Sequence, residues 1–200
     1  MAEGDELFDR LQARYEEGRV PWDDEMPLPE VAQIAASLPP GRALDLGCGY
    51  GRSSIYLARR NWVVDGVDFI PLAIAGALAR AEMAGVAEKA NFHLGRVTYL
   101  PFLSGPYDLA LDVGCMHALD DTGLSQYRDE VYRLLRSGGL YLLFAHLRSD
   151  EEEVPGRGVY EATLHTLFGS HFTLEKVVHG TTQVENRPPF ASAWFWFRRN

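Results

Sequence analysis

Apolar residues between positions 41 and 150 fall in short continuous runs, and most segments between these runs show helical spacing. The runs predict strands at 43–46, 63–69, 90–94, 109–113 and 140–145. A strand that is apolar along its whole length is typical of a parallel sheet buried on both faces. Because helices alternate with these strands, the pattern predicts an α/β fold with right-handed crossover connections.

Helical spacing predicts helices at 53–60, 71–84 and 124–135, and two further helices, at 5–18 and 29–38, before the first strand. Pro39, Pro40 and Gly41 follow these first two helices, and Pro and Gly interrupt regular structure. We therefore expect a helical extension at 1–40 and a main domain at 41–200.

The last part of the chain departs from this alternation. Residues 172–178 and 191–197 are two strand-like runs, and the loop around 180–189 separates them. A parallel crossover needs a dozen or more residues, so these two strands should pair antiparallel. The predicted fold is a doubly wound, mostly parallel, seven-stranded Rossmann-like sheet with an antiparallel C-terminal strand.

Composition narrows the class of protein. The chain has 200 residues, 46% of them apolar, which fits one domain with a sizeable core. Its 19 basic and 28 acidic residues give a net charge of -9, which repels phosphate backbones and anionic lipid. We therefore expect no nucleic acid or membrane partner, and a monomer or a homodimer. Two cysteines and an acidic N-terminus without an apolar run predict a cytoplasmic protein.

The turn after the first predicted strand carries the clearest candidate chemistry. Residues 45–51 read Asp-Leu-Gly-Cys-Gly-Tyr-Gly, and Asp68 lies near the end of the next predicted strand. Glycines let the backbone approach a ligand at a helix N-terminus, and an acid at the second strand can hydrogen-bond ribose hydroxyls. A tight turn without a ligand is the alternative, which the spaced acid and the following Phe69 disfavour. The pattern predicts a nucleoside-containing cofactor.

Two residues distinguish between cofactors. A dinucleotide-binding turn has its third glycine where Arg52 stands in this chain. Asp45, which precedes the first glycine, would repel a pyrophosphate but suits a ligand with an ammonium group. The sequence therefore favours S-adenosylmethionine over NAD.

Two motifs carry a family resemblance. Residues 43–52, Ala-Leu-Asp-Leu-Gly-Cys-Gly-Tyr-Gly-Arg, and 67–69, Val-Asp-Phe, resemble the first two motifs of class I S-adenosylmethionine-dependent methyltransferases. The resemblance covers about 41–199, and the late antiparallel pair matches the reversed seventh strand of that family. It implies that 41–200 is the S-adenosylmethionine-binding methyltransferase domain.

The resemblance also implies roles for single residues. The glycines that would approach the methionine portion of the cofactor are Gly47, Gly49 and Gly51. Asp45 would lie near the polar groups of that portion. Asp68 would hold the ribose, and Phe69 would pack on the adenine.

The chain departs from the family pattern after the third strand. The family often has an Asp there that accepts a hydrogen bond from the adenine amino group, and Arg96 stands at about that place. Arg cannot accept a hydrogen bond. The backbone of Arg96 or Val97 would then serve the adenine, or Arg96 turns outward.

Two histidines are candidates for catalysis. Methyl transfer from a sulfonium is an in-line displacement that needs alignment, and a general base helps only when the acceptor atom carries a proton. The family topology places residues beyond the fourth strand toward the methyl group, so His117 is the first candidate to orient or deprotonate the acceptor. His146, after the fifth strand, is the second. The alternative for each histidine is a structural role, such as capping a loop.

Two further residues of the fourth-strand segment are candidates. Asp112 either orders the loop that follows the strand or contacts the cofactor, and Cys115 is a candidate substrate contact. The spacing of Cys115 and His117 is that of a metal-binding pair, yet no third or fourth ligand stands at a matching distance in the sequence. We therefore expect no metal.

The N-terminal extension carries a candidate lid. The extension, the glycine turn and the Gly-Cys-x-His segment follow one another in the order that is typical of the thiopurine and tellurite-resistance branch of small-molecule methyltransferases, which the chain therefore resembles. In that branch a Trp-bearing segment covers the active site. Tyr15 and Trp22 would then wall the cofactor or substrate, or else attach the first helix to the core. An extension this short favours a small acceptor, such as a thiol, a selenium or tellurium species, or another soft nucleophile.

Three functions follow in order of preference. The first is an S-adenosylmethionine-dependent methyltransferase that acts on a small molecule. The second is a catalytically silent S-adenosylmethionine-binding module. The third, an NAD-type oxidoreductase, is disfavoured by Asp45 and Arg52.

Overall fold

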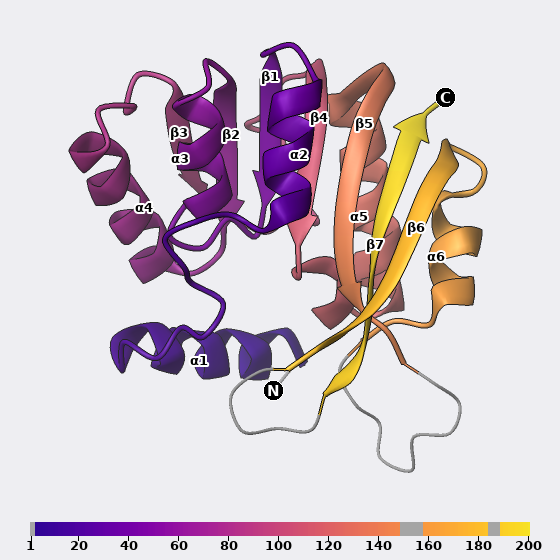
Figure 1. Ribbon diagram of the computed structural model, residues 1–200. Coiled ribbons are helices and arrows are strands. Elements are labelled where there is room, and N and C mark those ends of the chain that lie inside the picture. The colour runs from indigo at the N-terminus through magenta and orange to yellow at the C-terminus, as the bar shows by residue number, and fades with distance from the viewer. Residues whose placement is uncertain (1–2, 149–157, 184–188) are drawn as a thin grey trace. The chain divides into compact units, whose positions relative to one another are not determined.

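The seven strands of the chain form one sheet in the order β3-β2-β1-β4-β5-β7-β6, mostly parallel and flanked by helices. The predicted fold class is thus confirmed. The computed structural model describes residues 3–148, 158–183 and 189–200. The chain divides into two compact units, residues 1–96 and 97–200. Figure 1 labels the helices and strands. Among the described helices, none is both long and apolar enough to cross a lipid bilayer.

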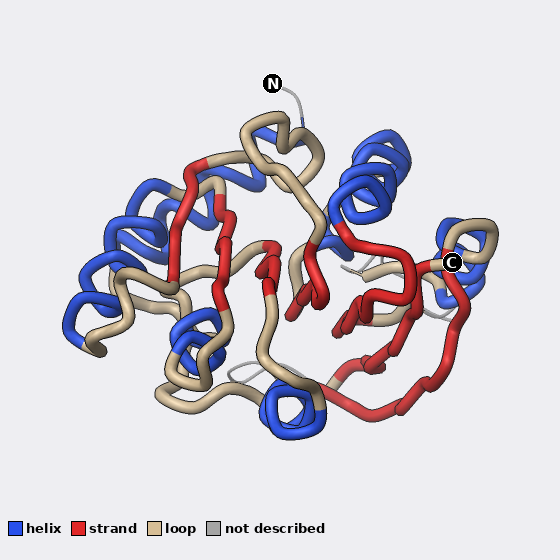
Figure 2. The backbone as a smooth tube through the Cα atoms, turned by 90° about the horizontal axis from the view of Figure 1, so that it is seen from above, coloured by secondary structure: helices blue, strands red, loops and turns tan. Residues whose placement is uncertain are grey.

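The N-terminal unit contains three parallel strands and four helices. The strands are β1 (Arg42–Leu46), β2 (Val63–Asp68) and β3 (Ala90–Leu94), and the helices are α1 (Glu3–Glu16), α2 (Pro29–Ser37), α3 (Arg52–Ala58) and α4 (Pro71–Met83). Both β1 and β3 pair with β2, and α3 and α4 pack against β2, β3 and each other (Figure 2). The apolar residues of β1 and most of β2 are buried, as the continuous runs predict.

Helix α1 lies across the carboxyl ends of β1 and β2 (Figure 1). Its buried Tyr15 packs in a cluster with Ile70 and Ala73, which follow β2 and begin α4. Phe8 and Leu11 of the same helix complete this contact. The helix therefore attaches to the edge of the sheet at which the glycine turn lies.

The C-terminal unit holds the other four strands. Its elements are β4 (Tyr107–Val113), the short helix η1 (Met116–Ala118), α5 (Asp121–Leu134), β5 (Leu135–His146), α6 (Glu161–Phe168), β6 (Phe172–Thr182) and β7 (Phe190–Arg199). Strand β5 is parallel to β4, and β7 is antiparallel to both β5 and β6. The predicted antiparallel pair at the C-terminus is confirmed. Residues 184–188 of its connecting loop lie outside the described part of the chain.

Two elements of this unit differ from the sequence prediction. Strand β5 begins at Leu135, five residues before the predicted start. Leu135 pairs with Tyr107 of β4, and the register then shifts so that Leu140 pairs with Leu109. Helix α6 was not predicted, since a helix of eight residues offers little periodicity. Its Phe168 joins an aromatic core with Tyr141, Phe172 and Phe197.

Candidate functional site

The glycine turn connects β1 to α3 and is fixed to the neighbouring strand. The amides of Gly47 and Cys48 donate hydrogen bonds of 2.8 and 3.0 Å to the carbonyl of Val67 in β2. Gly47, Gly49 and Gly51 all have positive φ, with values of 72°, 55° and 78°. Because L side chains rarely adopt this conformation, the three glycines are needed for the backbone path of the turn.

Asp68 joins the end of β2 to the glycine turn. Its carboxylate accepts hydrogen bonds from the amides of Gly49 and Ile70, both at 2.9 Å. The side chain is buried, and this burial raises the pKa of Asp68 above its usual value. The turn and the predicted ribose-binding acid are therefore in direct contact.

Asp45 is the second buried acid of this region. Its hydrogen-bond donor is the hydroxyl of Ser54 in α3, 2.6 Å away. Burial raises the pKa of Asp45 to about 6, although the Ser54 hydrogen bond and the charge of Arg52 act in the opposite direction. A buried carboxylate whose donor is a neutral hydroxyl favours a nearby cation, because the cation would stabilise its charged form.

Two aromatic rings that sequence reasoning missed fill the space beside the turn. A Cβ atom at Gly51 would lie 2.6 Å from the ring of Phe92, and one at Gly66 would lie 2.8 Å from the same ring. A Cβ at Gly76 would lie 2.4 Å from the ring of Tyr50. Gly66 and Gly76, which lie outside the cofactor motif, were the available sequence signal, since each makes room for one of these rings.

Tyr15 and Trp22 differ in what they contact. A Cβ at Gly49 would lie 3.1 Å from the Tyr15 hydroxyl, so this side chain lies against the glycine turn. Burial and the charge of Asp68 raise the pKa of Tyr15 well above its ordinary value. Trp22 is 41% exposed, and its ring packs edge-on against Tyr15 and under the Arg14 guanidinium. Both rings attach the N-terminal segment to its unit, and Tyr15 also lies against the glycine turn.

The helix-to-sheet attachment includes an ion pair that the sequence did not indicate. Asp23 accepts two hydrogen bonds from Arg80 of α4, at 2.8 and 2.7 Å. The Arg80 guanidinium also lies 4.4 Å from the centre of the Tyr50 ring, which packs edge-on against Tyr15. No local pattern connects residues that are 57 positions apart.

Phe69 and Arg96 form the predicted adenine region. The Arg96 guanidinium lies 5.8 Å from the centre of the Phe69 ring, and Phe8 of α1 packs edge-on against the same ring. The Arg96 side chain is exposed, and its guanidinium is near the Phe69 ring. Val97, the next residue, is buried.

Asp112 organises the loop after β4. Its carboxylate accepts hydrogen bonds from the amides of Gly114, Cys115 and Met116, at 2.7 to 3.0 Å. The hydroxyl of Tyr127 donates a fourth hydrogen bond, at 2.8 Å. Burial raises the pKa of Asp112 to about 6 against these bonds. Of the two roles considered for this acid, the contacts support loop ordering.

His117 and His146 lie together within the C-terminal unit. Their rings stack with centroids 4.1 Å apart and planes 23° apart, and the amide of His146 points to Nδ1 of His117 at 3.4 Å. Burial lowers the pKa of His117 to about 3 and that of His146 to about 4. Cys115 is partly exposed in the loop that carries His117.

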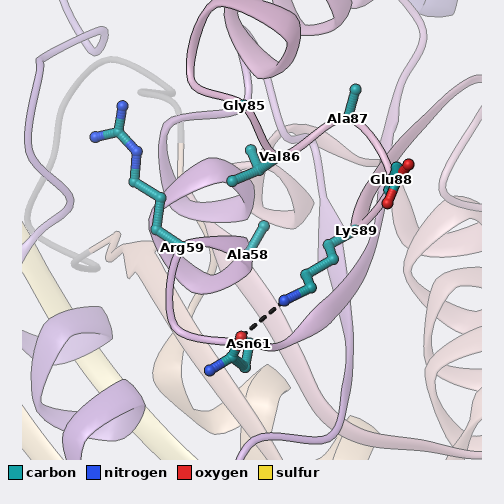
Figure 3. A pocket seen from close by; sticks show the side chains of 8 residues that line it. All are labelled: Ala58, Arg59, Asn61, Gly85, Val86, Ala87, Glu88 and Lys89. Carbon is teal, nitrogen blue, oxygen red and sulfur yellow. Dashed lines mark hydrogen bonds between the residues drawn. The ribbon is translucent and has the colours of Figure 1, made fainter.

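A pocket in the N-terminal unit lies away from the glycine turn (Figure 3). Its walls are Ala58, Arg59 and Asn61, which precede β2, and residues 85–89, which precede β3. Lys89 donates a hydrogen bond to Asn61 at 2.7 Å. These are the amino ends of the strands, whereas the glycine turn and Asp68 follow carboxyl ends. The pocket is therefore not the predicted cofactor site.

Comparison with known proteins gives a family match. Residues 43–139 match the family described as "Methyltransferase domain". Ajmaline N-methyltransferase and norajmaline N-methyltransferase, both from Rauvolfia serpentina, are 27% and 28% identical over 56% and 58% of this chain. The chain spans 38% and 43% of these two relatives, about two-fifths of their length.

Solved structures share the fold. TehB from Haemophilus influenzae is similar with a TM-score of 0.77, at 18% identity over 94% of this chain and 67% of that one. Burkholderia thailandensis 1,6-didemethyltoxoflavin-N1-methyltransferase, solved with its substrate and S-adenosylhomocysteine, has a TM-score of 0.76. It is 24% identical over the whole of this chain and 91% of its own.

Residues 43–139 are thus similar to a methyltransferase domain, in agreement with the resemblance to class I S-adenosylmethionine-dependent methyltransferases. The cofactor of this family is S-adenosylmethionine, which carries an ammonium, a sulfonium and a ribose. The N-terminal unit is compatible with this cofactor, because it places three glycine backbones and two buried acids, Asp45 and Asp68, at one turn.

Proposed function

We propose that this chain transfers a methyl group from S-adenosylmethionine to a small-molecule acceptor. The observation that supports this proposal is the hydrogen bond between Asp68 and Gly49, which joins the ribose acid to the glycine turn inside the residues that match the methyltransferase domain. In this proposal Gly47, Gly49, Gly51 and Asp45 receive the methionine portion.

The other site residues have assigned roles in the same proposal. Asp68 binds the ribose, Phe69 packs on the adenine, and Arg96 covers Phe69 while the backbone at Val97 serves the adenine edge. Tyr15 walls the cofactor, and Trp22 holds α1 in place. His117 and Cys115 contact the acceptor.

Small acceptors of two kinds fit the proposal. Soft anions such as thiolates and ionised selenium or tellurium species react without a general base. Nitrogen heterocycles belong in the same test, because relatives of this chain are N-methyltransferases by name.

Calorimetric titration tests the cofactor assignment. We expect S-adenosylmethionine and S-adenosylhomocysteine to bind and NAD not to bind. The variant Asp68→Ala should weaken S-adenosylmethionine binding by at least about 1 kcal/mol, the scale of a lost buried hydrogen bond. Asp65→Asn is the matched control, since Asp65 is a buried acid of the same strand that pairs with Arg42 and His93 instead. Equal losses in both variants would contradict a ribose role for Asp68.

Turnover separates an enzyme from a silent module. Incubation with S-adenosylmethionine and a panel of thiols, phenols, iodide and nitrogen heterocycles should release S-adenosylhomocysteine with at least one acceptor. Tight cofactor binding without release across the panel would favour the silent module. Tight NAD binding without S-adenosylmethionine binding would favour the oxidoreductase.

A further inference from the structure

The hydrogen bond at Nδ1 of His117 determines which nitrogen of the ring carries a proton. The backbone N–H of His146 donates to this atom at 3.4 Å, which is long for a hydrogen bond but directed at the ring nitrogen. A neutral imidazole has one N–H donor and one acceptor nitrogen. Because an amide hydrogen occupies the acceptor position at Nδ1, the proton of the neutral ring belongs on Nε2.

The surroundings of His117 keep the ring neutral. Its side chain is buried, the His146 ring stacks on it, and Gly114 lies against its Cε1 edge. Asp112, just before the loop, accepts four hydrogen bonds from the loop amides and Tyr127. No carboxylate among the described residues pairs with the ring, and burial holds the pKa of His117 at about 3.

His146 holds this arrangement from the end of β5. Its ring lies between His117 and Phe190, whose centroids are 4.1 and 4.3 Å away, and Phe144 packs edge-on against it. Its contribution to His117 is thus a stacked ring and a backbone N–H. Neither depends on the His146 imidazole nitrogens.

We infer that His117 acts as a fixed hydrogen-bond donor through Nε2–H, which orients the methyl acceptor and takes no proton from it. Nε2 has no partner among the described residues, so its donor is available to a ligand. This inference rests on the proposed methyl transfer. His146 is a positioning residue, because it acts through His117.

The inference defines a class of acceptor. Its nucleophilic atom arrives with a free electron pair, as in a thiolate or an unprotonated ring nitrogen, and a lone pair on it or its neighbour accepts from Nε2–H. The electron pair forms the new bond to carbon while the carbon–sulfur bond of the sulfonium breaks, leaving the neutral thioether S-adenosylhomocysteine. No proton passes to the enzyme.

Nuclear magnetic resonance tests the tautomer without any acceptor. Two-bond ¹H–¹⁵N correlation spectra of protein labelled with ¹⁵N-histidine report the protonated nitrogen of each ring. The His117 signals, assigned by their loss in His117→Gln, should show the Nε2–H pattern and no titration between pH 5 and 8. His146→Phe should leave this pattern unchanged, since Phe preserves the stacked ring and the backbone N–H. An Nδ1–H pattern, or a titration midpoint in that range, would overturn the inference.

Kinetics with 4-nitrothiophenol, a thiol that ionises readily, tests the donor role. His117→Gln retains a side-chain N–H donor and His117→Leu does not, so kcat/KM should be about tenfold higher in the Gln variant. Equal losses of kcat/KM in both variants would instead indicate that His117 acts as a base, if the pH profile of the wild-type enzyme also shows an inflection that the ionisation of the free thiol does not explain. If the wild-type protein methylates none of the panel, the proposed function fails, while the spectra still decide the tautomer.

Discussion

Asp45 connects the protonation of one buried side chain to cofactor binding. Burial raises the pKa of this acid to about 6 in the free protein, although the Ser54 hydroxyl and the charge of Arg52 act in the opposite direction. S-adenosylmethionine brings two positive groups, which stabilise the ionised form. Binding should therefore release a proton when the pH is near or below 6.

The affinity for S-adenosylmethionine should fall as the pH falls through 6. Above this value Asp45 is ionised and favours the cationic ligand, whereas at pH 5 about a tenth of it is ionised, so the dissociation constant should rise about tenfold from its value at pH 7.5. Titration calorimetry at both values measures this change. Asp45→Asn should bind S-adenosylmethionine weakly at both pH values. Any pH dependence of the dissociation constant that remains in this variant is assigned to Asp68. An identical slope in Asp45→Asn and wild type would exclude Asp45 as the cause.

At the scale of elements, a series of side-chain contacts attaches the N-terminal helix and the loop after it to the rest of their unit. Asp23 pairs with Arg80, Arg80 stacks on Tyr50, and Tyr50 packs against Tyr15 over the glycine turn. The Arg80 side chain is 42% exposed, so the ion pair contributes at most about 1 kcal/mol to the free energy of unfolding. Its larger effect should be local, on the opening of α1.

Removal of this pair should loosen α1 before it affects the sheet. We expect Arg80→Ala to speed amide hydrogen exchange in Glu3–Glu16 severalfold and to leave β1 and β2 unchanged, because the lost contacts fix the loop that follows α1 and the Tyr50 ring that packs against the helix. Hydrogen-exchange mass spectrometry measures both segments. Arg198→Ala is the control, since Arg198 makes a similar two-bond pair with Glu175 in the other unit. Unchanged exchange in α1 would show that the apolar contacts suffice.

The elements themselves were largely predictable, because buried parallel strands leave continuous apolar runs. The acids Asp45 and Asp68 were also predictable, since sequence spacing places each at a strand end beside the glycine turn. The ring of Phe92 under Gly51 and the pairing of Asp23 with Arg80 were not. Such contacts depend on side-chain packing between segments that are distant in sequence, and no periodicity records them.

Across the whole molecule, buried groups of opposite kinds act on stability in opposite directions as the pH falls. Asp45 and Asp112 have a pKa of about 6, above the ordinary value of 3.8, so the folded state binds protons first and gains stability as the pH falls toward 4. His117 and His146 have a pKa of about 3 and about 4, below 6.5, so the unfolded state binds protons first and folding loses stability below 6.5. The two pairs therefore act in opposite directions.

Single variants should expose this balance between pH 7.5 and pH 5. Asp45→Asn removes a group that stabilises the folded state as the pH falls, so the free energy of unfolding of this variant should fall more than that of wild type on acidification. His117→Gln removes a group that destabilises the folded state as the pH falls, so the free energy of unfolding of this variant should fall less than that of wild type. Each difference from wild type should be on the order of 1–2 kcal/mol. Urea unfolding followed by circular dichroism at both pH values measures the changes, each variant being compared with itself so that its packing cost cancels. Changes of the same sign in the two variants would mean that groups other than these buried ones control the acid response.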